Sequence, residues 1–228
     1  MDGVTVPCRW RFAGRRGYAE ALALQKDLVR RRIAGEVSDT LLFVEHPHVI
    51  TLGKVAHREH LLAARSDVEV VETDRGGDVT YHGPGQVVGY PIVNLGGLRR
   101  DVKWYLERLE EVMVRAVAAY GVRAGRQPGM TGAWVGDRKI GAIGVRVERW
   151  VTSHGFALNA NTDLSFFDLI IPCGLAGKGV TSLAKETGRD VDLDDLRRRL
   201  AEAFGAVFGR RMEHEHENGE PRDEVRGR

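Results

Sequence analysis

Hydrophobic and polar positions along the chain first predict three helices. Over 17–33 and 101–120, apolar residues recur every three or four positions with charged residues between them, as on amphipathic helices. Gly121 follows the second segment and is a typical helix stop. A third helix is predicted over about 192–208, introduced by Asp190 and Asp192.

Shorter apolar runs predict strands. They lie at 40–45, 49–53, 68–73 and 87–95, with a short helix over 57–64 and several strands between 131 and 160. The Gly-Asp pair at 136–137 indicates a hairpin turn. Pro91 predicts an edge strand or a bulge, because proline cannot donate to a sheet ladder. Residues 165–185 are predicted to be mostly loop.

The order of these elements favours an α+β fold with a mixed, largely antiparallel sheet flanked by helices, because strands follow one another directly in the second half. No Pro/Gly/Ser-rich linker divides the chain, so we expect a single domain over 1–208. The remaining residues, 209–228, are charged and are predicted to form a disordered tail.

Composition narrows the function. The 228 residues include 34 Lys+Arg and 32 Asp+Glu, a balance that argues against a nucleic-acid-binding protein. Two cysteines, Cys8 and Cys173, are too few for a disulfide framework. Neither a signal-peptide pattern nor an apolar run of membrane-spanning length occurs. We therefore expect a cytoplasmic protein with free thiols and no nucleic-acid or membrane partner.

A glycine-rich stretch at 75–86, RGGDVTYHGPGQ, is the first candidate site. Glycines allow a backbone to approach a ligand closely. The alternative is a tight structural loop around His82. The dinucleotide fingerprint does not fit the spacing of Gly83, Gly85 and Gly89, and GLAGKGVT at 174–181 fails the P-loop pattern, so nucleotide binding is not predicted.

Cys173 and Lys139 are the candidate reactive residues. Cys173 lies between Pro172 and Gly174, a loop setting that suits a nucleophile, although a free cysteine is more often buried and structural. Lys139 follows the hairpin turn and would ordinarily be exposed. If it lies beside Cys173 instead, its charge would favour the thiolate. The histidines form no convincing ligand set, so no metal site is predicted.

Four blocks occur in order: RGGDVTYHGPGQ, GDRKIGAIGVRV, SHGFALNANTDL and IIPCGLAGKGVTSL. Together they resemble the lipoyl(octanoyl) transferase family, the octanoyl-[acyl-carrier-protein]:protein N-octanoyltransferases. The resemblance implies a fold like that of biotin and lipoate protein ligases, with 1–208 as the catalytic domain and no cofactor. It also implies a role in protein lipoylation and lipoate biosynthesis.

The same resemblance assigns residues to roles. Cys173 is implied to carry the acyl group as a thioester, with Lys139 as its partner. The implied acyl-binding residues fall in three segments: Arg75, Gly76, Gly77, Asp78, Val79, Thr80, Tyr81 and His82; then Ala142, Ile143 and Gly144; then Gly155, Phe156 and Ala157. The apolar residues of these glycine-rich segments are expected to line a narrow acyl tunnel.

The implied reaction moves an octanoyl or lipoyl group from acyl carrier protein to a lysine of a lipoyl domain. The implied acceptors are the E2 subunits of 2-oxoacid dehydrogenases and the glycine cleavage H protein. Two alternatives remain open: an ATP-dependent lipoate or biotin ligase, which would not need Cys173, and a non-catalytic module that binds acyl carrier protein or a lipoyl domain.

Overall fold

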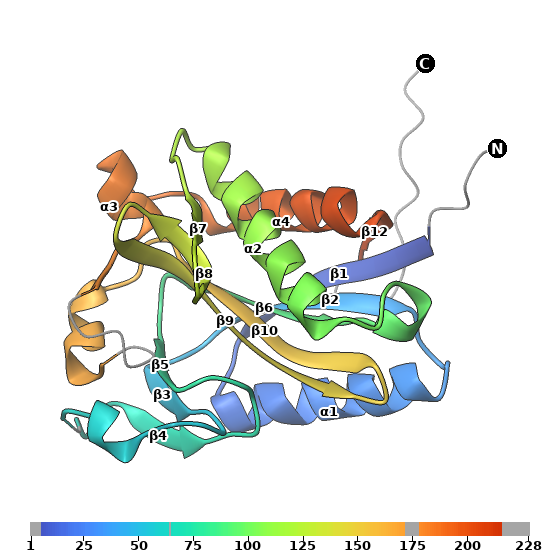
Figure 1. Ribbon diagram of the computed structural model, residues 1–228, viewed down its shortest axis with the longest axis horizontal. Coiled ribbons are helices and arrows are strands. Elements are labelled where there is room, and N and C mark those ends of the chain that lie inside the picture. The colour runs from blue at the N-terminus through green and yellow to red at the C-terminus, as the bar shows by residue number, and fades with distance from the viewer. Residues whose placement is uncertain (1–5, 64, 172–177, 216–228) are drawn as a thin grey trace.

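The fold is a mixed sheet covered by helices on both faces, with a smaller sheet at one end (Figure 1). The computed structural model describes residues 6–63, 65–171 and 178–215. One long helix lies along one face of the main sheet, and two helices cross the opposite face (Figure 1). The predicted α+β class is therefore confirmed.

The main sheet contains nine strands within the described residues. They are β1 (Val6–Arg15), β2 (Asp39–Glu45), β6 (Gln86–Ile92), β7 (Gly125–Gln127), β8 (Met130–Val135), β9 (Arg138–Glu148), β10 (Val151–Asn159), β11 (Gly179–Val180) and β12 (Arg210–His214). The order is β12-β1-β2-β6-β10-β9-β8-β7, and β11 pairs with β9. Only the β1–β12, β1–β2 and β9–β11 pairs are parallel, so the sheet is largely antiparallel as predicted.

The three long helices match the periodic segments of the sequence. The helices are α1 (Tyr18–Ile33), α2 (Val102–Ala118), α3 (Leu183–Thr187) and α4 (Leu193–Phe208), with 3₁₀ turns η1 (Arg58–His60), η2 (Leu95–Gly97) and η3 (Leu164–Leu169). In contrast, α3 and η3 include residues of the stretch 165–185, which was predicted to be mostly loop. Asp101 and Asp192 accept hydrogen bonds from the first-turn amides of α2 and α4, which fixes where these helices begin. The helix predicted over 57–64 is only the single turn η1, and none of the described helices is long and apolar enough to span a membrane.

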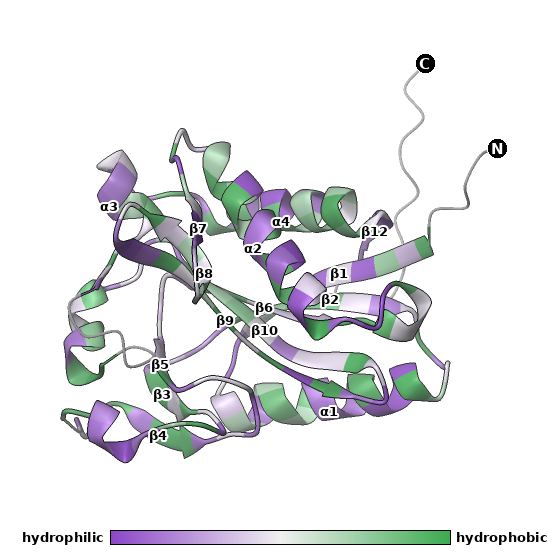
Figure 2. Ribbon diagram, in the orientation of Figure 1, coloured by the Kyte–Doolittle hydropathy of each residue, from purple (hydrophilic) through white to green (hydrophobic). Residues whose placement is uncertain are grey.

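Two apolar clusters hold the layers together. The larger lies between the sheet and the pair α2 and α4, and the smaller lies between the sheet and α1. Hydrophobic and hydrophilic residues alternate along α1 and α2, as Figure 2 shows. Each helix therefore turns its apolar stripe toward the sheet, which is the arrangement that the sequence period predicts.

The smaller sheet consists of β4 (Glu69–Glu72), β3 (Val49–Leu52) and β5 (Val79–His82), in that order. The strands β3 and β4 were predicted. The strand β5 lies inside the glycine-rich stretch and was not distinguished from it, because glycines on both sides of its four residues indicate a loop. A separate apolar cluster with Phe166, Phe167 and Ile170 packs against this sheet.

Pro91 does not lie on an edge strand. Its strand, β6, is paired on both sides, with β2 and with β10. The β6–β10 ladder runs only from Gln86 to Gly89, so no partner on β10 needs the amide that Pro91 lacks. The hydroxyl of Thr152 donates to the Pro91 carbonyl oxygen at 2.7 Å instead. The edge prediction is therefore wrong, and an interrupted ladder accommodates the proline.

The disordered tail predicted from 209 is wrong for its first residues. Arg210–His214 form β12, which pairs in parallel with β1. Residues 216–228 lie outside the described residues. The strand is held by a buried carboxylate: Asp39, 1% exposed, accepts from Arg210 at 3.0 Å and 2.9 Å and from Arg32 at 2.9 Å. It also accepts from the amide of Asn94 at 3.0 Å.

We predict that Asp39→Ala lowers the free energy of unfolding by about 3–5 kcal/mol, because it leaves buried guanidinium groups without their carboxylate. Chemical denaturation measures this loss. The matched control is Glu213→Ala on β12, whose carboxylate is 41% exposed and pairs only with Arg211 among the described residues. That change should cost at most about 0.5 kcal/mol. Equal losses in both variants would contradict the role of Asp39.

Candidate active site

Lys139 is buried, although its place after a hairpin turn suggested exposure. It is the second residue of β9 and is 8% exposed. Its Nζ lies 4.9 Å from the centroid of the Trp134 ring, within cation–π range. On its other side, Val180 of β11 is its Cα partner, and the amide of Thr181 donates to its carbonyl oxygen at 3.0 Å. The β8–β9–β11 packing therefore directs this side chain inward.

Cys173 lies outside the described residues, as do Pro172 and Gly174. The described chain stops at Ile171, whose amide donates to the carbonyl oxygen of His60 at 2.8 Å. It resumes before β11, which pairs with the segment of β9 that carries Lys139. The other cysteine, Cys8, is fully buried under the sheet, and burial raises the pKa of its thiol.

Two cavities lie next to each other in the interior, and Lys139 lines the first of them. The first is lined by Thr80, Gln86, Lys139, Gly141, Ala142, Ala157, Asn159, Phe167 and Val180. The second is lined by Tyr18, Arg75, Gly77, Thr80, His82, Val88, Tyr90, Ala142, Ile143, Gly144, His154, Gly155, Phe156 and Ala157. They share Thr80, Ala142 and Ala157, so they adjoin each other, and together they are called here the passage.

Small residues face one another across the paired strands that line the passage. In the β9–β10 register, Ala142 faces Ala157 and Gly144 faces Gly155. A Cβ on Gly155 would lie 2.2 Å from the carbonyl oxygen of Gly89, and one on Gly144 would lie 2.8 Å from that of Gly76. These close backbone approaches exclude larger residues, because real Cβ atoms do not come so near.

Most of the sequence-predicted acyl-binding residues meet around this passage. Ten of the fourteen line it: Arg75, Gly77, Thr80, His82, Ala142, Ile143, Gly144, Gly155, Phe156 and Ala157. They come from three segments of the chain, which are β5 with the loop before it, β9 and β10. The structure thus gathers the three predicted segments around one space.

The other four predicted residues, Gly76, Asp78, Val79 and Tyr81, do not line the passage. On β5, side chains alternate, so Thr80 and His82 face the passage while Val79 and Tyr81 face the neighbouring apolar cluster. The Asp78 carboxylate accepts from the backbone amide of His57 at 3.0 Å and contacts His60 Nδ1 at 2.5 Å. These side chains stabilise the small sheet.

Sequence reasoning did not single out several lining residues. They are Tyr18, Val88, Tyr90, Gly141, His154, Asn159, Phe167 and Val180, together with Gln86, which stood in the glycine-rich stretch without a role of its own. The alternation of Gln86, Val88 and Tyr90 along β6 was a usable signal, because every second residue of a strand shares a face. Tyr18, on α1, gave no such signal.

Arg75 closes the glycine-rich loop from inside. Its guanidinium, buried in the protein, donates to the carbonyl oxygen of Thr51 at 2.7 Å, to the Thr51 hydroxyl at 2.9 Å and to the carbonyl oxygen of Asp78 at 2.7 Å. A further donation reaches the carbonyl oxygen of Gly76 at 3.0 Å. Neutral backbone acceptors therefore satisfy several of its five N–H donors and fix the loop that Gly77 contributes to the passage.

His82 is held neutral. Its complete burial, with a smaller contribution from His46, lowers its pKa to about 3. Its Nδ1 lies 2.7 Å from Gln86 Oε1, which accepts, so Nδ1 carries the proton. Gln86 in turn donates to Asn159 Oδ1 at 2.9 Å, and Asn159 donates to the Thr181 carbonyl oxygen at 3.0 Å. This polar network runs from the passage to the neighbourhood of Lys139.

Two tyrosines complete the deep end of the passage. The Tyr90 hydroxyl donates to Nε2 of His46 at 2.7 Å, because Nδ1 of His46 already donates to the Arg16 carbonyl oxygen at 2.8 Å. Burial raises the pKa of Tyr90 well above its usual value and lowers that of His46. The Tyr18 hydroxyl bonds to Thr73 Oγ1 at 3.1 Å. Both phenols therefore remain protonated and neutral.

Comparison with known proteins agrees with this architecture. The family model of the lipoyl protein ligase A/B catalytic domain matches residues 17–205. An octanoyltransferase of Solibacter usitatus is 51% identical over 206 residues, covering 88% of this chain and 93% of the relative. An octanoyltransferase of Rubrobacter xylanophilus is 50% identical over 206 residues, covering 87% and 92%.

Solved structures show the same fold at low sequence identity. A crystal structure of lipoate-protein ligase A bound with ATP superposes with a TM-score of 0.76 at 16% identity, covering 93% of this chain and 91% of that one. Biotin protein ligase from Aquifex aeolicus gives a TM-score of 0.52 at 11% identity, covering 89% and 69%. The expected resemblance of the fold to lipoate and biotin ligases is confirmed.

We predict that Ala142→Leu narrows the passage where its two cavities join and weakens octanoate binding. Overpacking of about 1–3 kcal/mol corresponds to a loss of roughly 5- to 150-fold in affinity. Isothermal titration calorimetry with octanoate measures it. The control is Val147→Leu on the same strand, outside the passage lining, which should bind octanoate like the parent protein. Unchanged affinity in Ala142→Leu would show that octanoate binds elsewhere.

Proposed function

The chain belongs to the lipoyl protein ligase A/B catalytic-domain family and, within it, to the octanoyltransferases, and we propose that it carries the octanoyl group as a thioester on Cys173. The donor is octanoyl acyl carrier protein, and the acceptor is a lysine of a lipoyl domain. The acceptor domains are those of 2-oxoacid dehydrogenase E2 subunits and the glycine cleavage H protein. The reaction takes place in the cytoplasm and serves lipoate biosynthesis.

The observation that carries the proposal is the setting of Lys139. Among the described residues that line the first cavity, it alone has an ionisable side chain. The remaining lining is aliphatic, aromatic, hydroxyl or amide. An amine at the end of an apolar passage suits a reaction in which an acyl chain lies in the passage and its carbonyl group remains at the mouth.

The chain order supports Cys173 as the partner of Lys139. The strand β11 begins six positions after Cys173 and pairs with Arg138 and Lys139. Cys8, in contrast, is fully buried on β1, and its raised thiol pKa makes it a poor nucleophile. Cys173 is the remaining thiol of the chain.

The first half-reaction moves the acyl group to the enzyme. Lys139 takes the proton of the Cys173 thiol, and the thiolate attacks the carbonyl carbon of the donor thioester. A new C–S bond forms, the donor C–S bond breaks, and Lys139 returns the proton to the departing thiol. One thioester replaces another, so the step is close to balanced in free energy.

The second half-reaction makes the amide. The neutral ε-amine of the acceptor attacks the Cys173 thioester, a C–N bond forms, and the C–S bond breaks. Lys139 relays the proton lost by the amine to the Cys173 sulfur. Because an amide is more stable than a thioester, no ATP is required. His82 cannot serve as the base in either step, since its pKa near 3 leaves it a very weak one.

We predict that mixing the protein with octanoyl acyl carrier protein produces a covalent octanoyl adduct, visible by intact-mass spectrometry, and that Cys173→Ala abolishes it. The matched control is Cys8→Ala, which should form the adduct like the parent protein. An ATP-dependent ligase would need ATP and free octanoate and would tolerate Cys173→Ala. A binding module would form no adduct at all. Full transfer activity in Cys173→Ala would overturn the proposal.

We predict that Lys139→Ala lowers the rate of transfer by roughly 10²- to 10⁴-fold, the usual contribution of a general acid–base group. Single-turnover kinetics should show both half-reactions slowed, with far-ultraviolet circular dichroism unchanged. The control is Lys178→Ala, a nearby lysine whose ammonium pairs with the exposed Asp137. Equal rates in Lys139→Ala and the parent protein would refute this role.

A further inference from the structure

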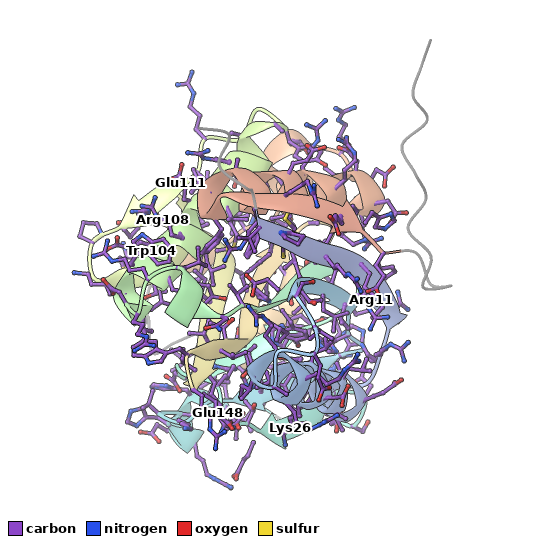
Figure 3. The ribbon with its side chains drawn as sticks, turned by 90° about the vertical axis from the view of Figure 1, so that its right-hand side faces the viewer. Arg11, Lys26, Trp104, Arg108, Glu111 and Glu148 are labelled. Atoms are coloured by element: carbon purple, nitrogen blue, oxygen red, sulfur yellow. The ribbon has the colours of Figure 1, made fainter. Side chains whose placement is uncertain are left out.

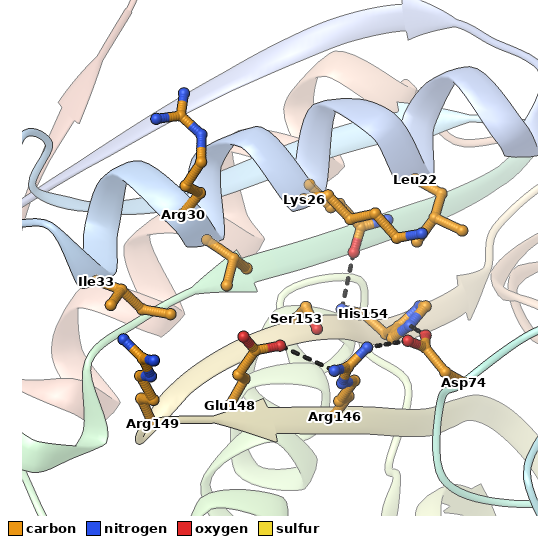
Figure 4. A pocket seen from close by; sticks show the side chains of 12 residues that line it. Leu22, Lys26, Arg30, Ile33, Asp74, Arg146, Glu148, Arg149, Ser153 and His154 are labelled. Atoms are coloured by element: carbon orange, nitrogen blue, oxygen red, sulfur yellow. Dashed lines mark hydrogen bonds and ion pairs between the residues drawn. The ribbon is translucent and has the colours of Figure 1, made fainter.

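A third cavity continues beyond the deep end of the passage. It lies between α1 and the β9–β10 hairpin and is called here the groove (Figure 4). Its lining residues are Leu22, Gln25, Lys26, Val29, Arg30, Ile33, Asp74, Arg146, Glu148, Arg149, Ser153 and His154. His154 is the one residue that lines both the groove and the passage among those described. It therefore forms the wall between them.

The His154 side chain is fixed between one residue of each space. It is 2% exposed. Its Nε2 donates to the Asp74 carboxylate of the groove at 2.8 Å, and its Nδ1 faces the Tyr18 hydroxyl of the passage at 3.4 Å. The Asp74 carboxylate is also paired with Arg146 (Figure 4). A histidine with both ring nitrogens engaged cannot swing aside without losing these partners.

The backbone of His154 adopts an uncommon conformation that its surroundings must hold in place. Its φ is +53°, in the left-handed region that few residues other than glycine adopt, although asparagine, aspartate and histidine occur there more often than the others. The amide of His154 donates to Gln25 Oε1 of α1 at 2.8 Å, which anchors the strained residue. Strain of this kind persists where the surroundings impose it, and it occurs often in ligand-binding sites.

We propose that His154 closes the deep end of the passage and thereby sets the longest acyl chain that the protein accepts. The inference rests on the proposed function, because it takes the passage as the acyl site. An octanoyl chain extends from Lys139 past Ala142 and Ala157 toward His154. A longer chain reaches the imidazole, which is polar, fixed and unable to yield, so it is rejected.

The groove supplies the space that a longer chain would need. Three aliphatic side chains of α1 line it: Leu22, Val29 and Ile33. Its charged groups are found at both ends: Lys26 of α1 and Glu148 of β9 occupy the same end of the molecule (Figure 3), whereas the Asp74–Arg146 pair lies beside His154. Removing the imidazole would therefore join the passage to a further space that is aliphatic on its α1 side.

The test is His154→Gly, which removes the wall and suits the left-handed backbone, so the variant should fold. Isothermal titration calorimetry with octanoate and dodecanoate gives the ratio of their affinities without turnover. We expect this ratio to shift at least about 10-fold toward dodecanoate, since even one methylene in an apolar pocket is discriminated by about 10- to 200-fold. His154→Asn tolerates the same backbone and should shift the ratio in the same direction by less.

The matched control is Ser153→Gly, the adjacent residue, which lines the groove but not the passage. It should keep the parent ratio. An unchanged ratio in His154→Gly, or an equal shift in Ser153→Gly, would overturn the inference. Transfer from octanoyl acyl carrier protein is measured in parallel. A shifted binding ratio without transfer in the parent protein would reject the proposed function and leave the wall in place, whereas transfer with an unchanged ratio would reject the wall alone.

Discussion

The structure depends on an interior passage that runs along β9 and β10 while the backbone hydrogen bonds between these two strands are kept. Protein interiors are normally packed without voids. A passage along a sheet therefore requires small residues at neighbouring cross-strand pairs. Here Ala142 faces Ala157 and Gly144 faces Gly155 across β9 and β10, while the ladder between those strands continues from Gly141 to Glu148. The apolar clusters on both faces of the sheet compensate for the packing that the passage gives up.

Ionisable groups are distributed unevenly along the passage. Neutral groups line most of it, since burial keeps His82 and His46 unprotonated and keeps the phenols of Tyr18 and Tyr90 protonated. Lys139 lies at one end, and the paired His154 and Asp74 lie at the other. Between these ends the Arg75 guanidinium is a buried charge, and the carbonyl and hydroxyl oxygens that accept from it offset the cost of its burial.

Some side chains of the matching sequence blocks do not line the passage and instead hold its surroundings in place. The small sheet presents Thr80 and His82 to the passage, and Tyr81 packs on the opposite face against Phe166 and Phe167. Arg75 binds the loop before β5 to Thr51 of β3. Because side chains alternate along β5, every second side chain faces the passage and the others pack against the apolar cluster. A sequence block that matches a family in full therefore mixes residues of both kinds.

The sequence by itself determined the three long helices and most strands, since helical and strand periods are local properties of neighbouring residues. Matching blocks also singled out Lys139 and Cys173, which no period would have found. Tertiary structure decided the rest. It buried Lys139 between β8 and β11, placed Pro91 in an interior strand, and added β12 through the pairing of Asp39 with Arg210. It alone brought Tyr18, Asp74 and His154 together from three distant segments, because contacts between such segments depend on how whole layers pack and not on any local pattern.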